Sequence, residues 1–293
     1  MNKMTLTDSP KTALTPGKLG RLEHGEKNRH NENFPVGSLL IRPDLRAHVH
    51  AFYNFARAAD DISDDPLLDP DEKLRRLNRF VVALGDDAAN DIPVIVAMRT
   101  SLRAKRISPQ HCLDLLTAFK RDATKLRYRN WDDLMDYCRY SASSVGRHVL
   151  ALHGIGESAW PANDALCSVL QVINHIQDCA DDYRELDRVY IPQEMLAARG
   201  GSLADLSNES STAGLRATLD AMLDRLDAMM PTARDLPRCV PDKRLRCETS
   251  VIAELADSLI ALLRHRDPLC ESVKLGIAAK IGAVAKGVAR AWL

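Results

Sequence analysis

The sequence has no excess of either charge, because 40 acidic residues balance its 40 basic ones. A chain without a net field is not typical of proteins that bind nucleic acid, so we expect no such partner, and any anion site must be local. Its seven cysteines are an odd number and form no Cys-x-x-Cys pair. We therefore expect reduced thiols, as in a cytoplasmic protein.

Long apolar stretches are also missing. No run approaches the roughly 18 apolar residues of a membrane span, and the first residues, MNKMTLTDSPKTALTPGK, lack the apolar core of a signal peptide. These absences favour a cytoplasmic location, with any membrane association confined to the protein surface. Residues 1–28, rich in Lys, Thr, Pro and Gly, are predicted to form a disordered tail.

Strand-like alternation of apolar and polar residues is absent too. Apolar residues instead recur at helical spacing, and 45% of the chain is hydrophobic, enough for a large core. We predict an all-α single domain over residues 29–293. Its main helices are expected at about 43–65, 70–85, 92–104, 108–122, 132–154, 164–185, 215–230, 251–265 and 273–293.

Residues 53–65, YNFARAADDISDD, place four carboxylates within six positions at the end of the first predicted helix. One stripe of this helix carries, in order, Tyr53, Arg57, Asp60 and Asp64. The two aspartates lie one turn apart and repel each other. Such a run is commonly a solvated helix end, so this segment alone does not indicate chemistry.

A second segment, LQVINHIQDCADDYRELDRVY at residues 170–190, repeats the pattern. Its stripe carries Gln171, Asn174, Asp178 and Asp182 at steps of three and four residues. Two helices therefore each offer a pair of carboxylates one turn apart. This repetition favours a functional interpretation over a solvated helix end.

Paired carboxylates without histidine or cysteine partners suit Mg²⁺, a hard ion commonly held by one or two carboxylates and by substrate phosphates. Such a site would neutralise a diphosphate and assist its departure, with Arg57 as a further contact to the same group. A di-iron bundle needs Glu-x-x-His motifs on two helices, and the chain has none around these aspartates. A Ser or Cys hydrolase lacks its nucleophile motif here.

At these residues the sequence resembles the squalene/phytoene synthase family, from about His30 to Pro268. DDISD is similar to the family's first aspartate-rich motif, LQVINHIQDCADD to its second, and RVYIP (188–192) to a further family segment. The resemblance implies an isoprenoid-synthase helical bundle around a central cavity. It also implies isoprenoid diphosphate substrates and about two or three Mg²⁺ ions.

The resemblance further assigns roles to individual residues. The catalytic residues it implies are Tyr137, which matches a family tyrosine in YCRYSASSVG, with Asp60, Asp64, Asp178 and Asp182. The metal ligands it implies are Asp60, Asp64, Asn174, Asp178 and Asp182. The substrate contacts it implies are His30, Asn33, Phe34, Tyr53, Arg57, Gln171, Asn174, Arg188 and Tyr190.

Within the family, HNENFPVGSLLIRPDLR and RDPL resemble the bacterial hopanoid-pathway branch. This implies ionisation of presqualene diphosphate and capture of the cation by water, giving hydroxysqualene without NADPH, alongside pathway partner enzymes. Gln177 departs from the arginine usual before Asp178, and Ser143 from a family glycine. Loss of that cation argues against a full two-step synthesis. Two alternatives stay open: head-to-head condensation of two prenyl diphosphates, and a non-catalytic scaffold of the same fold.

Two features have alternative explanations. The small residues of SASSVG (141–146) allow close approach either of another helix or of a long substrate. The last segment carries one apolar stripe, listed from its start as Val273, Ile277, Ile281, Val284, Val288 and Trp292. That stripe is typical of a terminal helix packed on the domain, and it also permits contact with a membrane surface.

Overall fold

The computed structural model describes residues 42–292. The predicted tail at residues 1–28 lies outside this range, as do His30, Asn33 and Phe34. The predicted boundary at residue 29 therefore stays a prediction. Everything below concerns the described residues.

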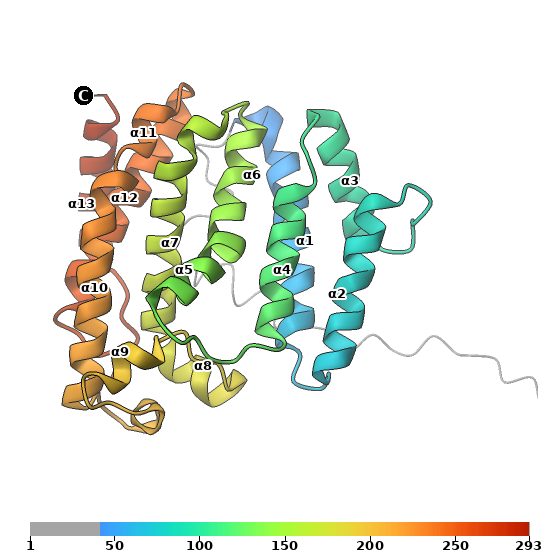
Figure 1. Ribbon diagram of the computed structural model, residues 1–293. Coiled ribbons are helices and arrows are strands. Elements are labelled where there is room, and N and C mark those ends of the chain that lie inside the picture. The colour runs from blue at the N-terminus through green and yellow to red at the C-terminus, as the bar shows by residue number, and fades with distance from the viewer. Residues whose placement is uncertain (1–41, 293) are drawn as a thin grey trace, which may run out of the picture. The chain divides into compact units, whose positions relative to one another are not determined.

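The described chain is built of α-helices, as predicted (Figure 1). The first half contains α1 (Pro43–Asp64), α2 (Pro70–Gly85), α3 (Pro93–Lys105), α4 (Gln110–Asp122), α5 (Trp131–Cys138) and α6 (Ser144–Leu152). The second half contains α7 (Trp160–Gln177), α8 (Cys179–Leu186), α9 (Gln193–Ala197), α10 (Ala213–Ala233), α11 (Leu236–Cys239), α12 (Lys243–Leu263) and α13 (Ile277–Arg290). Extended pairing within residues 42–292 is limited to one isolated bridge between Arg127 and Val189.

Local sequence signals explain where several helices begin. Pro43 opens α1, where its missing N–H and fixed φ suit the first turn. Asp69 caps α2 by accepting a hydrogen bond from the backbone N–H of Glu72. Both starts were predicted, and both are confirmed.

A buried cluster fixes α1 against α2, α3 and α4. It includes Phe52, Phe55, Leu77, Phe80 and Met98, each at most 6% exposed. Phe52 and Phe55 occupy the inward face of α1. Its acidic stripe therefore lies on a different face and is half-buried. The core thus holds the first carboxylate pair on a rigid helix.

The second acidic segment is not the single helix that was predicted. The helix is interrupted at Asp178, whose backbone has φ −102° and ψ 9°, and α8 begins after it. Hydrogen bonds still run from the Asp178 N–H to the Asn174 carbonyl at 2.9 Å and from the Asp182 N–H to the Asp178 carbonyl at 2.8 Å. Asp178 therefore sits at a local irregularity that interrupts the helix without separating its two halves.

The close approach of another helix, α7, explains why one of the small residues around the start of α6, Gly146, is a glycine. A Cβ on Gly146 would lie 2.1 Å from Oδ1 of Asn163 and 2.5 Å from Sγ of Cys167, both on α7. Just before it, residues Arg139–Ser143 form a π-helical turn, a feature frequent at functional sites. Gly146 is thus required for close packing of α6 on α7.

His148 on α6 is fully buried and stacks on Phe52 with ring centroids 4.1 Å apart. Neither ring nitrogen has a hydrogen-bond partner among the described residues. Burial, followed by the nearby His111 and His48, lowers its pKa to about 3. In the unfolded chain the imidazole pKa is near 6.5, so the unfolded state binds the extra proton between these values.

We expect this histidine to make the fold sensitive to acid. Stability should be fully present above about pH 6.5 and fall by up to about 1.4 kcal/mol per pH unit below it. His148→Leu should lose about 2 kcal/mol less free energy of unfolding than the wild type between pH 7 and pH 5. Denaturant unfolding at the two pH values measures this difference, and equal losses in both proteins would contradict it.

The last helix, α13, packs on α12, but not through the predicted apolar stripe. Its buried residues are Ala283 and Gly287, followed by Ala291 just beyond its end. The stripe from Ile277 to Trp292 is exposed, and only Val273, before the helix, is buried. Small residues occupy the inward position because α12 approaches the helix too closely for larger side chains.

Candidate active site

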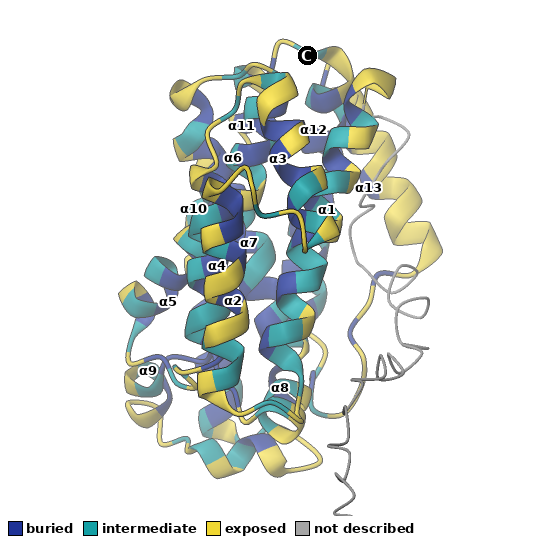
Figure 2. Ribbon diagram, turned by 90° about the vertical axis from the view of Figure 1, so that its right-hand side faces the viewer, coloured by how far each residue is buried: buried dark blue, intermediate teal, exposed yellow. Residues whose placement is uncertain are grey.

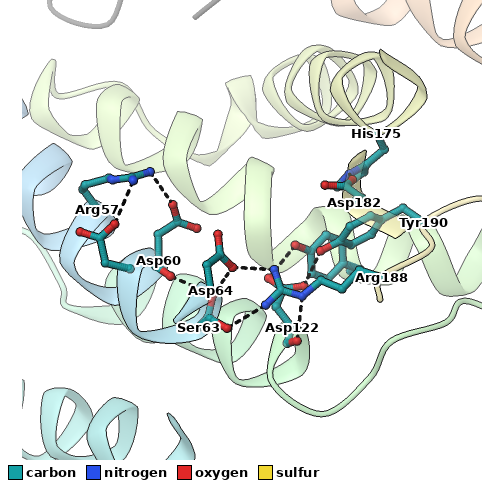
Figure 3. A network of polar contacts seen from close by, with 11 residues as sticks. Arg57, Asp60, Ser63, Asp64, Asp122, His175, Asp182, Arg188 and Tyr190 are labelled. Carbon is teal, nitrogen blue, oxygen red and sulfur yellow. Dashed lines mark hydrogen bonds and ion pairs between the residues drawn. The ribbon is translucent and has the colours of Figure 1, made fainter. Parts of the chain in front are cut away.

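The first carboxylate pair lies near the C-terminal end of α1, held by arginines from two directions (Figure 3). Arg57 donates to Asp60 at 2.9 Å and also pairs with Asp61 at 2.9 Å. Asp64 instead accepts from Nη1 of Arg188 at 2.6 Å. Arg57 thus pairs with Asp60, whereas Asp64 has its own cation, and the predicted contact of Arg57 with a diphosphate stays a prediction.

Asp60 is a carboxylate whose negative charge the protein leaves poorly compensated. Its pKa is raised to about 7, first by burial among the helices and then by the charge of Asp64, against the opposing effect of Arg57. A bound cation would relieve both effects. The pair therefore has the electrostatic character of a metal site.

A buried carboxylate that the sequence pattern did not reveal lies at the centre of this region. Asp122, at the end of α4, accepts hydrogen bonds from the hydroxyls of Tyr137 and Tyr190, both at 2.8 Å. Nε of Arg188 donates to its backbone carbonyl at 3.0 Å. Burial raises the pKa of Asp122, while Arg188 and the two tyrosines act in the opposite direction.

Arg188 is the link between Asp122 and the first pair. Its side chain is buried and also donates Nη2 to the carbonyl of Ser63 at 2.9 Å. Each of its three nitrogens thus has a protein partner, on α1 or α4. Arg188 and Tyr190, predicted as substrate contacts, have inward bonds in this structure that brace the site.

The second pair is connected to the same network by ring stacking. His175 on α7 stacks on Tyr190, with centroids 3.6 Å apart and planes 13° from parallel. Its Nε2 lies 3.1 Å from Nε2 of Gln171, and its Nδ1 lies 3.9 Å from a carboxylate oxygen of Asp182. The sequence interpretation gave His175 no role, because its neighbours become apparent only once α7, α8 and the 188–190 segment are folded together.

Asp178, the other member of the second pair, is exposed to solvent on one side. Desolvation by the surrounding helices and then the charge of Asp182 raise its pKa to about 6, while Lys274 acts in the opposite direction. Both pairs thus contain one acid with a raised pKa. Both also lie toward the same end of the helices, where α1 ends and α7 passes into α8 (Figure 1).

Gln177, the departure noted in the sequence, connects this pair to the chain that follows α12. Its Nε2 donates to the carbonyl of Val273, and the next residue is Lys274, whose charge acts on Asp178. The charge of Lys274 acts on Asp178 in the same direction as His175, but more weakly.

The donor set fits Mg²⁺ bound together with a substrate. Among the described residues, no three His, Cys, Asp or Glu side chains converge as a ready metal cage. Each pair offers two hard oxygen donors with raised pKa at one member, which suits an ion that keeps waters and takes further ligands from phosphates. Asn174 and Tyr53, also predicted at the site, are half-buried on α7 and α1.

Comparison with known proteins decides the family. The squalene/phytoene synthase family profile matches residues 27–277. The chain belongs to the squalene/phytoene synthase family. This membership confirms the expected class of enzyme, an isoprenoid synthase, and squalene/phytoene synthases act on prenyl diphosphates and typically depend on divalent metal ions.

Two curated squalene/phytoene synthase relatives are similar over nearly their whole length. The chain is 42% identical over 268 residues to a hydroxysqualene synthase of Rhodopseudomonas palustris, covering 90% of this chain and 91% of the relative. It is 44% identical over 269 residues to a hydroxysqualene synthase of Sinorhizobium fredii, covering 89% and 91%.

Solved structures of squalene/phytoene synthases agree with the fold. The squalene synthase HpnC from Alicyclobacillus acidocaldarius aligns with a TM-score of 0.69 and 32% identity, covering 80% of this chain and 89% of that one. A dehydrosqualene synthase aligns with a TM-score of 0.78 at 20% identity, covering 90% and 94%. The second likeness supports the fold alone.

Proposed function

We propose that this protein is a carbon–oxygen lyase that ionises presqualene diphosphate and lets water capture the cation, giving hydroxysqualene and diphosphate. The observation that carries the proposal is the pair of acidic sites, Asp60 with Asp64 and Asp178 with Asp182, connected through one buried polar network. The hydroxysqualene synthases, similar to this chain over nearly all of their length, give the reaction its specific form.

Mg²⁺ would be held by the two carboxylate pairs and Asn174, and when bound it supplies charge neutralisation of the leaving diphosphate. The residues of the chain position that group. Arg57, which pairs with Asp60, would add a cation to the diphosphate site. Arg188 keeps Asp64 oriented through the hydrogen bond from its Nη1. The predicted central cavity would enclose the hydrocarbon chains.

In the reaction, the carbon–oxygen bond to diphosphate breaks and its electron pair leaves with the diphosphate. The cyclopropylcarbinyl cation that remains rearranges and is attacked by a water oxygen, which then loses a proton. Tyr137, fixed by Asp122, would present its ring and hydroxyl to the cation. No hydride donor is required, so we expect no need for NADPH.

Head-to-head condensation of two prenyl diphosphates is the alternative within the same family. It would use the same two acidic pairs, and the weak effect of the Lys274 charge on Asp178 supports it, because Gln177 stands where a cation is usual in the family. A non-catalytic scaffold is disfavoured, since such a protein would not need four carboxylates in these positions.

Purified protein with Mg²⁺ and presqualene diphosphate should yield an alcohol equally well with and without NADPH. Farnesyl diphosphate is the comparison substrate. No turnover of presqualene diphosphate together with ready consumption of farnesyl diphosphate would contradict the proposal and favour condensation. We also propose that α13 contacts a membrane. The enzymes that supply the substrate and consume the alcohol are proposed as partners of the protein.

A further inference from the structure

The helix α13 presents a row of large apolar side chains to solvent, which we call the α13 row. Its members and their exposed fractions are Ile277 80%, Ile281 64%, Val284 44%, Val288 38% and Trp292 62%. Among the described residues, nine large hydrophobic side chains are exposed, and the other four are dispersed over the chain. The α13 row is therefore a concentrated apolar surface and not the scatter expected on any protein. Figure 2 shows α13 as a largely exposed helix.

Packing fixes which face of α13 turns outward. A Cβ on Gly287 would lie 2.5 Å from the Cα and 2.7 Å from the backbone nitrogen of Val251 on α12. Only a face of small residues can approach α12 this closely, and Ala283 and Ala291 complete it. Rotating the helix to bury the α13 row would place bulky side chains against that backbone. The exposure of the row is thus built into the packing.

The charges in the segment that carries the row have one sign. Residues 272–293 contain four basic residues and no acidic one. Arg290 pairs with Glu254 on α12, while Lys280 and Lys286 are exposed. At the end of the row, Nζ of Lys243 lies 5.6 Å from the ring centroid of Trp292. An apolar row with a terminal tryptophan, and with Lys243 and Lys280 beside it, is typical of a helix that lies in a lipid interface.

We propose that the α13 row rests on an anionic lipid surface. A stable protein interface takes about 20–30 residues on each side, and this narrow row has five, too few to hold a second copy by itself. A lipid surface needs no matching groove, and it offers negative charge to Lys243 and Lys280, which lie beside the row.

The place of the helix in the fold agrees with this proposal. α13 begins three residues after Lys274, in the segment that Gln177 ties to the second carboxylate pair. The inference rests on the proposed function in one respect. A substrate and a product with long hydrocarbon chains dissolve in lipid, so the membrane is where both are found. A protein docked through α13 would have its diphosphate site close to that reservoir.

The test is sedimentation of the full-length protein with vesicles of phosphatidylcholine, alone or mixed with phosphatidylglycerol. The wild type should bind the mixed vesicles more tightly than the neutral ones. The triple variant Ile277→Gln/Ile281→Gln/Val284→Gln should lose more than about tenfold in affinity for both. Lys243→Gln/Lys280→Gln should lose about fivefold per lysine on the mixed vesicles only.

The matched control is Leu67→Gln/Val82→Gln, which removes apolar side chains that are 91% and 66% exposed elsewhere and should bind as the wild type does. Turnover of detergent-dispersed presqualene diphosphate should be unchanged in every α13 variant, so a failure of the proposed function is seen separately. Absence of vesicle binding by the wild type, or equal binding by the triple variant, would overturn the inference. A lower melting temperature or the loss of a dimer in the triple variant, without a change in vesicle binding, would also overturn the inference. The row would then be covered by protein.

Discussion

Asp60→Ala and Asp178→Ala should each reduce diphosphate release from presqualene diphosphate by at least about 1,000-fold, or about 4 kcal/mol in the barrier. Each substitution removes one of the two carboxylates of its pair and so weakens the hold on the ion that neutralises the leaving group. Asp60 and Asp178 are also the acids of the two pairs whose pKa is raised, to about 7 for Asp60 and to about 6 for Asp178. Single-turnover assays of released diphosphate at saturating Mg²⁺ measure the loss.

The chain offers adjacent controls for both substitutions. Asp61 and Asp181 are exposed acids beside Asp60 and Asp182, and Asp61→Ala and Asp181→Ala should each change the rate less than about tenfold. If Asp60→Ala or Asp178→Ala retained the activity of these controls, the assignment of a metal–diphosphate site to the two pairs would be wrong.

Asp122→Asn should lower kcat by about 100-fold while changing KM by much less. Asparagine keeps the shape, but its amide nitrogen cannot accept a hydrogen bond, so one of the two tyrosine hydroxyls loses its acceptor. A misplaced Tyr137 affects the step in which the cation forms, whereas ground-state binding of the diphosphate depends on the two acidic pairs. Steady-state kinetics with presqualene diphosphate separates the two parameters.

A tyrosine in the same aromatic cluster provides the control for a merely structural effect. Tyr128 stacks on Tyr190 with centroids 5.4 Å apart, but its buried hydroxyl has no partner among the described residues. Tyr128→Phe should therefore leave kcat nearly unchanged, while Tyr137→Phe should lower it. The combination of Tyr137→Phe with Asp122→Asn should be much less than additive, because both act on one hydrogen bond. Full additivity would show that Asp122 does not act through Tyr137.

The sequence predicted those features that depend on residues near each other in the chain. The cap at Asp69, the start at Pro43 and the spacing of Asp60 and Asp64 are all local, and each is confirmed as a helical feature. Asp122 could not be predicted, because FKRDATK reads as an ordinary helix end. Its partners Tyr137 and Tyr190 lie 15 and 68 residues away.

The last helix shows a second limit of local patterns. Periodicity correctly identified a two-sided helix at the C-terminus, and it carries no information on which side meets the domain. That choice depends on how closely α12 approaches, which Gly287 reveals only in three dimensions. Asp178 is similar: the four-residue spacing predicted its place on a helical stripe, but not the break at that residue.

The most direct test of the central claim is turnover of presqualene diphosphate in H₂¹⁸O, with Mg²⁺ and without NADPH, followed by mass spectrometry of the product. If water captures the cation, the product is an alcohol that carries one ¹⁸O atom, and the diphosphate that leaves is unlabelled. An unlabelled alcohol, or a hydrocarbon formed only when NADPH is added, would contradict the account.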